Sequence, residues 1–144
     1  MRCKLFCLMF LLFGFGSYLN AQNTEINFSG VRSSKGQIIL RIYKDEKSFD
    51  DDKPSKIHYF KKSNLSKGKM TASITLDPGT YGLALADDEN NSNLMDFGFL
   101  GVPSEGFGFS NYYHSGFTSP SFDSFKFTVA KNQKYKISMK IRYM

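Results

Sequence analysis

The chain has 144 residues, of which 41% are hydrophobic and 16% are aromatic, so it is long enough for one domain with a sizeable core. Its 19 Lys and Arg residues outnumber 13 Asp and Glu residues, but no basic run is long enough to indicate a nucleic-acid groove. Both cysteines, Cys3 and Cys7, lie at the N-terminus, which excludes a disulfide framework or a cysteine nucleophile from residues 8–144.

Residues 1–21 have the pattern of a signal peptide. Arg2 and Lys4 precede an apolar run at 5–15, which is short of the ~20 residues that span a membrane, and residues 17–21 provide a cleavage region that ends at Ala21. We expect cleavage after Ala21, which leaves a single domain at 22–144 with no transmembrane span and a net charge lowered from +6 to +4. The expected location is the periplasm or the cell exterior, and a retained anchor is the alternative.

A period of two dominates the rest of the chain and predicts β-strands. Turn residues separate the strands, for example at 32–36, which ends in Gly36, and at 77–79, which reads Asp-Pro-Gly. The acidic stretch 44–56 breaks the pattern; it fits a solvated loop with a short helical turn around Phe49, because Pro54 excludes a longer helix. The predicted strands are 24–31, 37–43, 57–62, 70–76, 81–86, 122–130 and 135–143.

Two of these strands carry further information. In 81–86, large residues alternate with Gly82, Ala84 and Ala86, which indicates a face that lies beneath something bulky or a close approach of another backbone segment. Strands 122–130 and 135–143 are separated by a polar turn and are predicted to form a hairpin. About seven short strands without a long helix predict an all-β domain, and a two-sheet sandwich fits better than a closed barrel.

The segment between residues 86 and 121 interrupts the strand pattern. A connection of this length is usually functional or disordered, and this one contains many Phe and Tyr residues, which argue against disorder. We expect one long ordered loop that packs over the end or the face of a sheet. Its aromatic residues provide candidate contacts for a ligand or partner, with packing inside the loop as the alternative: Phe107, Phe109, Tyr112 and Tyr113.

The first part of this loop, ADDENNSNLMD, gathers oxygen-bearing side chains at alternating positions. Such spacing is typical of Ca²⁺ loops, which supply six to eight oxygen ligands. The candidate ligands are Asp88, Asn90, Ser92, Asp96 and the more distant Glu105. Asn93 stands where a glycine normally makes the sharp turn, and asparagine tolerates that conformation better than most residues. The alternative is a polar, solvated turn at the end of a strand.

The same region resembles the hallmark of an uncharacterised secreted bacterial family, domain of unknown function 2141. The family pattern is P-G-x-Y, a strand, D-E-N-x-N-G-x-x-D, and then G-x-P-x-E-G-x-G-F-S. The resemblance implies an immunoglobulin-like or transthyretin-like β-sandwich, and it implies no activity. Ser92 and Asn93 depart from the pattern. The matching residues are Pro78, Gly79, Tyr81, Asp88, Glu89, Asn90, Asp96, Gly101, Pro103, Glu105, Gly106, Gly108, Phe109 and Ser110.

Three functions are compatible with this pattern. The first is a non-enzymatic exported domain that binds a protein or glycan partner through the aromatic loop, with a cation in the 87–105 loop. The second is a structural accessory domain of the cell envelope, which would pair through a sheet edge. The third is a hydrolase that uses two carboxylates, such as Asp88 or Asp96 with Glu105. Ser110 lacks the surroundings of a nucleophilic serine.

Overall fold

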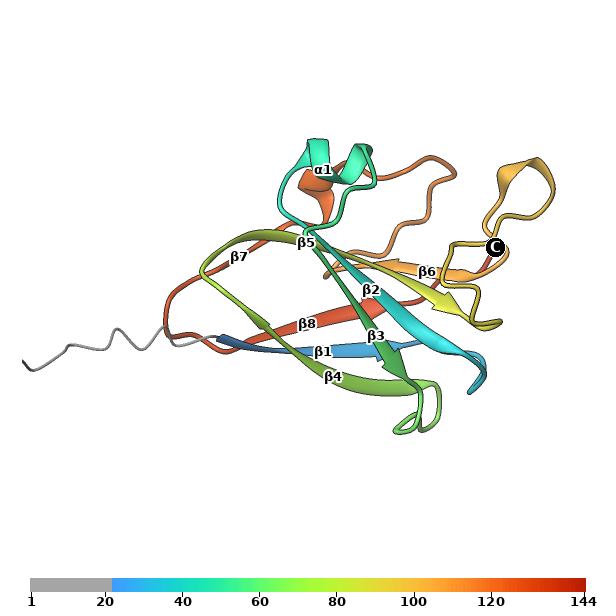
Figure 1. Cartoon of the computed structure of the whole chain (residues 1–144), viewed down its shortest axis with the longest axis horizontal. Coiled ribbons are helices and arrows are strands. Elements are labelled where there is room, and N and C mark those ends of the chain that lie inside the picture. The colour runs from blue at the N-terminus through green and yellow to red at the C-terminus, as the bar shows by residue number, and fades with distance from the viewer. Residues whose placement is uncertain (1–21) are drawn as a thin grey trace, which may run out of the picture.

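The domain is a sandwich of two β-sheets, shown in Figure 1. The computed structural model describes residues 22–144, so the predicted signal peptide, Cys3 and Cys7 lie outside the described residues. The predicted all-β sandwich is confirmed. The described part of the chain has no helix that is long and apolar enough to cross a membrane.

One sheet has three strands in the order β4-β1-β8. Its strands are β1 (Gln22–Ser29), β4 (Lys69–Leu76) and β8 (Tyr135–Lys140). The central strand β1 runs antiparallel to β4 and parallel to β8. Because β8 returns to the first strand from the far end of the sequence, it closes the domain.

The other sheet has five strands, and β5 is at its centre. Four strands follow the order β3-β2-β5-β6, and β7 pairs with the beginning of β5, while β6 pairs with its end. The strands are β2 (Gln37–Tyr43), β3 (Lys56–Lys61), β5 (Gly79–Asp88), β6 (Gly106–Phe109) and β7 (Phe127–Val129). Three short helical turns complete the domain: α1 (Glu46–Asp50), η1 (Phe99–Gly101) and η2 (Phe122–Ser124).

The core lies between the sheets and is built by alternation along each strand. Leu83 of β5, Ile26 of β1 and Met139 of β8 are fully buried there. At one edge the sheets are joined, because Phe107 and Arg142 exchange backbone hydrogen bonds of 2.8 and 2.9 Å, and Ile141 donates to Ser29. The members of the core are Ile26, Phe28, Val31, Ile38, Leu40, Ile42, Met70, Ile74, Leu76, Tyr81, Leu83, Leu85, Val129, Ile137, Met139 and Ile141.

Most of the predicted elements are confirmed. Six of the seven predicted strands match observed strands within three residues at each end, and the helical turn expected around Phe49 is α1. Gly36 has the expected positive φ, at 70°. The expectation for Gly82 is also confirmed, because a Cβ there would lie 2.5 Å from the ring of Phe125 and 2.6 Å from that of Phe122.

Three predictions for the second half of the chain are wrong. Residues 122–130 form η2 and the short strand β7 instead of one strand, because Phe122 and Phe125 are both buried over Gly82. The predicted hairpin is absent from the described residues: β7 pairs with β5 in one sheet, and β8 pairs with β1 in the other. The long loop also contains an eighth strand, β6, whose Gly-Phe-Gly-Phe sequence hides it because glycine is unfavourable in strands.

Candidate functional site

Asp88 is the last residue of β5, and its carboxylate organises the turn that follows. The residue is fully buried. Its Oδ1 accepts the backbone N–H of Ser92 at 2.9 Å, and its Oδ2 accepts the N–H of Asn93 at 3.0 Å and the side-chain amide of Gln37 at 2.9 Å. Asn93 has a φ of 63°, in the left-handed conformation that the sequence suggested. Both oxygens of Asp88 are therefore satisfied by donors of the protein.

Asp96 closes the same turn from the other side. The side-chain amide of Asn90 donates to its Oδ2 at 2.5 Å, and the Ser92 hydroxyl lies 3.3 Å from the same oxygen. The backbone N–H of Ser104 donates to the Asp96 carbonyl oxygen at 2.9 Å. These bonds hold the two ends of the protruding segment 97–103 together.

Glu105 fastens the far end of the loop to its beginning. Its carboxylate is 5% exposed and accepts the backbone N–H groups of Glu89 at 3.2 Å and Asp96 at 3.4 Å. Burial raises the pKa of this carboxyl, and the negative charges of Asp96 and Asp88 raise it further. Within residues 22–144, no group of three or more His, Cys, Asp and Glu side chains is arranged to hold a metal ion.

A buried polar cluster lies at the end of the core, beneath residues 88–105, which we call the acidic loop. The ammonium of Lys62 contacts the carboxylate of Asp87 and donates to the carbonyl oxygens of Ser33 at 3.0 Å and Lys35 at 2.6 Å. The hydroxyl of Tyr143 donates to Asp87 from the segment that follows β8. Sequence analysis did not identify this cluster, because a single lysine at the end of a weak strand carries no signal of burial.

A second ion pair covers that cluster from outside. Arg32 makes a bidentate pair with Glu89, at 2.9 and 2.8 Å, and its guanidinium lies 4.2 Å from the centre of the Tyr143 ring. Paired planar groups of this kind fix geometry as well as charge. The pKa of Glu89 is lowered, mainly by the hydrogen bond from Arg32. The start of the acidic loop is thus held at a fixed position above the core.

The outer face of the five-stranded sheet, on the side away from the core, carries an apolar groove. Strand register aligns Arg41 with Ala84 and Phe109 in one row, and Ile39 with Ala86 and Phe107 in the next. The hollow has a volume of about 680 Å³, which lies within the roughly 300–1,000 Å³ that is usual for ligand sites. Because Ala84 and Ala86 have short side chains, the middle of the sheet forms the floor.

Three segments form the walls of this groove: α1 with its following turn, the acidic loop, and the loop 111–121. Aromatic rings anchor the α1 wall, since Phe49 packs edge-on against Tyr43 at 5.2 Å and against Phe125 at 4.9 Å between ring centres. Arg142 anchors the third wall by donating to the carbonyl oxygens of His114 at 2.9 Å and Gly116 at 2.8 Å. The walls are therefore attached to the sheet by specific contacts.

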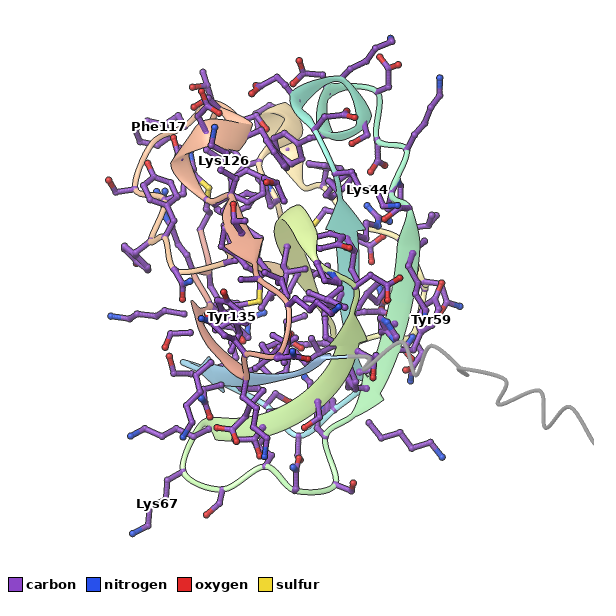
Figure 2. All side chains as sticks on the ribbon, turned by 90° about the vertical axis from the view of Figure 1, so that its left-hand side faces the viewer. Lys44, Tyr59, Lys67, Phe117, Lys126 and Tyr135 are labelled. Atoms are coloured by element: carbon purple, nitrogen blue, oxygen red, sulfur yellow. The ribbon has the colours of Figure 1, made fainter. Side chains whose placement is uncertain are left out.

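Large apolar side chains on the rim of the groove point into solvent. Leu94 is 64% exposed, Phe97 is 61% exposed and Phe117 is 91% exposed. Figure 2 shows Phe117 projecting from the molecule, on the side opposite the exposed Tyr59 of β3. An apolar hollow with an exposed aromatic rim is the usual composition of a surface that binds another molecule.

Comparison with known protein families agrees with the sequence motif. A sequence model described as "Uncharacterized protein conserved in bacteria (DUF2141)" matches residues 26–138. The chain belongs to this family. Neither a search of curated proteins nor a search of solved structures found a significant match to the DUF2141 chain.

The structure of this DUF2141 domain separates the four predicted contact residues into two pairs. Phe107 and Phe109 lie in the groove. Tyr112 packs against the aromatic cluster around Phe109, and Tyr113 is half exposed with the Lys140 ammonium 5.0 Å from its ring centre. Neither tyrosine is among the residues that line the groove.

Other groove residues of the DUF2141 domain were not predicted from the sequence. Leu94, Phe97 and Phe117 reach the rim, and Tyr43 and Phe49 come from a distant part of the chain. The signal for the floor was the run of small residues in β5, which predicted a covered or closely approached face. This holds at Gly82, whereas at Ala84 and Ala86 the face is the open floor of the groove. The sequence contains no information on register that would place Ala84 beside Phe109.

Ser110 has a structural position in the fold. Its buried hydroxyl donates to the carbonyl oxygen of Phe125 at 2.6 Å and accepts the backbone N–H of Leu83 at 3.0 Å. It therefore connects β5 to the segment beyond η2. Both of these contacts are with backbone groups, so the hydroxyl serves to join segments of the DUF2141 fold.

Proposed function

We propose that this chain is an exported, non-enzymatic binding domain, and that the groove on the outer face of the five-stranded sheet is its contact surface. The observation that carries the proposal is the hollow of about 680 Å³ over Ala84 and Ala86 with exposed aromatic side chains on its rim. Pockets of roughly 300–1,000 Å³ that are mainly apolar are typical ligand sites.

The exposed rim supports a binding role over a purely structural one. Most of the surface of Phe97 and Phe117 is in water, so neither ring contributes much to packing within the fold. Burying a side chain of this size contributes about 1.5–3 kcal/mol. A partner that covers both rings would gain that free energy without disturbing the core.

The hydrogen bonds of the acidic loop support a non-catalytic role. A glycoside hydrolase needs one carboxyl to donate a proton and another to act as a base or nucleophile. In this domain Asp88 and Glu105 accept backbone N–H groups of their own loop. Their geometry suits holding the loop in place.

Binding of a neutral apolar dye, Nile red, tests the contact surface. The parent domain should give saturable binding, and the variant Phe97→Ser with Phe117→Ser should bind about tenfold more weakly, because roughly 1.4 kcal/mol of apolar contact corresponds to that factor. Tyr59→Ser is the matched control, since Tyr59 is an exposed aromatic residue that does not line the groove. Equal binding by all three proteins would contradict the proposal.

Export to the periplasm or the cell exterior is part of the proposal, and the support is the signal-like pattern of residues 1–21. Expression of the full chain in a bacterial host, followed by fractionation and intact-mass measurement, tests it. The expected product is an exported protein that begins at Gln22. A protein retained in the cytoplasm with residues 1–21 attached would contradict export.

We also propose Ca²⁺ binding by the acidic loop; the support is the alternating spacing of its oxygen-bearing side chains and the hydrogen bonds that link Asp88, Asp96 and Glu105 through one turn. Binding would require the loop to exchange some of its internal hydrogen bonds for metal ligands. A ligand at a hundred times its Kd adds about 2.7 kcal/mol to stability. Thermal unfolding in Ca²⁺ and in chelator should therefore differ for the parent.

The same comparison with Asp88→Ala and Asp96→Ala assigns the ligands. Both variants should lose the Ca²⁺-dependent shift in Tm. If Ca²⁺ does not shift the Tm of the parent, a site coupled to folding is contradicted. If the shift in Tm survives both substitutions, the ion binds elsewhere.

A further inference from the structure

The groove has an acidic end. Asp50 and Asp52, at α1 and the turn after it, line the hollow next to Tyr43 and Phe49. Asp50 forms no ion pair with another described residue, and Asp52 is only weakly paired, since the guanidinium of Arg41 lies 3.5 Å from both of its oxygens. The side chain of Asp52 is 64% exposed.

Apart from Arg142, whose guanidinium donates to two backbone carbonyl oxygens of the loop 111–121, the other walls carry no Lys or Arg to balance these carboxylates. The sequence contains no Lys or Arg from residue 70 to residue 125, so neither the acidic loop nor the loop 111–121 contributes one. Residues 44–53, which include α1, carry five acidic and three basic residues. Within this segment Lys47 and Lys53 both contact Asp51. Arg41 is therefore the one Lys or Arg among the described residues that line the groove, where the two aspartates outnumber it.

We propose that the occupant of the groove is a segment of a protein partner that presents apolar side chains to the floor and a Lys or Arg side chain to Asp50 and Asp52. This inference rests on the proposed function and specifies its partner. Complementary charge at one end fixes the direction in which such a segment lies, in addition to strengthening its binding.

The position of the exposed side chains favours a polypeptide over a small molecule. On the rim of the groove, Phe117 is 91% exposed and Phe97 is 61% exposed, so most of each ring lies in solvent. A small molecule seated over Ala84 would leave them in water. A chain that crosses the groove between its walls would cover the rim as well, and the acidic end disfavours an anionic membrane surface.

Synthetic peptides test this inference directly. The labelled peptides share one apolar core and carry two Lys, two Gln or two Glu residues at one end. Each of these three is made in two versions, with the pair at the N-terminus or at the C-terminus. Fluorescence anisotropy with the parent domain should show the Lys peptide binding about tenfold more tightly than the Glu peptide, because each exposed charge pair contributes roughly 0.2–1 kcal/mol. The ratio should shrink as salt is added.

Substitution of the acidic end provides the reciprocal test. Asp50→Lys with Asp52→Asn should abolish or invert the preference for the Lys peptide, and asparagine preserves an acceptor for the Tyr43 hydroxyl and tolerates the φ of 48° at position 52. Glu25→Lys with Asp77→Asn changes the net charge equally outside the groove and should keep the preference. Circular dichroism checks that all variants are folded.

The possible results separate the two proposals. Equal binding of all three peptides, or a preference that the control also loses, would overturn the inference and leave the groove as a binding surface. Nile red binding without peptide binding would overturn the inference. Binding to neutral phosphatidylcholine vesicles that requires Phe97 and Phe117, without peptide binding, would assign the groove to a lipid surface instead. Failure of dye and peptides alike would contradict the proposed function itself.

Discussion

The hydroxyl of Tyr143 donates a hydrogen bond of 2.5 Å to Oδ2 of Asp87 and so joins the segment after β8 to the end of β5. Burial raises the pKa of the Tyr143 phenol, and the hydrogen bond to Asp87 raises it further. Because Asp87 directly precedes Asp88, this contact fixes the point at which the acidic loop leaves the sheet.

Replacing Tyr143 with Phe should lower the free energy of unfolding by about 2 kcal/mol, because hydrogen bonds to charged groups contribute roughly 1.5–3 kcal/mol. Urea denaturation measures the change. Tyr113→Phe is the control, since Tyr113 is half exposed, and its effect should be within about 0.5 kcal/mol. Equal effects of the two substitutions would show that the Tyr143 contact is not stabilising.

Lys62→Met should be more damaging than Tyr143→Phe. It leaves the fully buried Asp87 without its ammonium partner, and breaking a buried ion pair costs about 3–5 kcal/mol. Adding Asp87→Leu should recover part of the loss, since an apolar pair has no uncompensated charge. The free energies of unfolding of the two single variants and of the double variant form a double-mutant cycle. If the losses of the single variants simply add in the double variant, the two residues are not a coupled pair.

His58 should make the domain less stable in mild acid. Burial lowers the pKa of its imidazole, and the charge of Lys56 lowers it further, so the unfolded chain binds the proton more readily than the folded one. Stability is therefore complete above the ordinary pKa of about 6.5 and is lost as the pH falls through the lowered value.

The variant His58→Phe preserves the stacking of ring 58 on Phe60, which has a centroid distance of 5.9 Å. Urea midpoints measured from pH 8 to pH 5 should fall less for this variant than for the parent. If the difference in urea midpoint between the variant and the parent stays constant from pH 8 to pH 5, a lowered pKa at His58 is contradicted.

Ser110→Ala should destabilise the domain by about 1–3 kcal/mol, because it leaves the Leu83 N–H and the Phe125 carbonyl oxygen without the hydroxyl between them. Ser119→Ala, at an exposed position, is the control. Thermal unfolding of both variants measures the effect. A loss of stability no greater than that of the control would mean that water or a backbone shift replaces the hydroxyl.

The sandwich was predictable because alternation survives wherever one face of a strand is buried. In β8 and the residue after it, Ile137, Met139 and Ile141 alternate with polar residues, and all three are buried in the core. Pairing was less predictable. A short turn between 122–130 and 135–143 suggested a hairpin, but the buried rings of Phe122 and Phe125 place the first segment on the five-stranded sheet.

The acidic loop was predictable as a cluster but not as a set of hydrogen bonds. The sequence indicated that Asp88 and Asp96 share one polar turn, and the structure links both carboxylates through Ser92. Side-chain oxygens at those positions can serve a cation or a backbone N–H equally well. The groove could be predicted only in part. Its floor depends on the register of Ala84 against Phe109, and its acidic end depends on Asp50, which lies 34 residues earlier in the chain.

The proposed contact surface is the groove, and not the carboxylates of the acidic loop or the exposed face of the opposite sheet. The most direct measurement is a titration of the ¹⁵N-labelled domain with the Lys-ended apolar peptide, followed by amide chemical shifts. If the groove is the contact surface, the largest changes in chemical shift will cluster at Ala84, Ala86 and Phe117, with Asp50 at one end. Changes confined to residues 88–93, or to the exposed face of β4, β1 and β8, would contradict it.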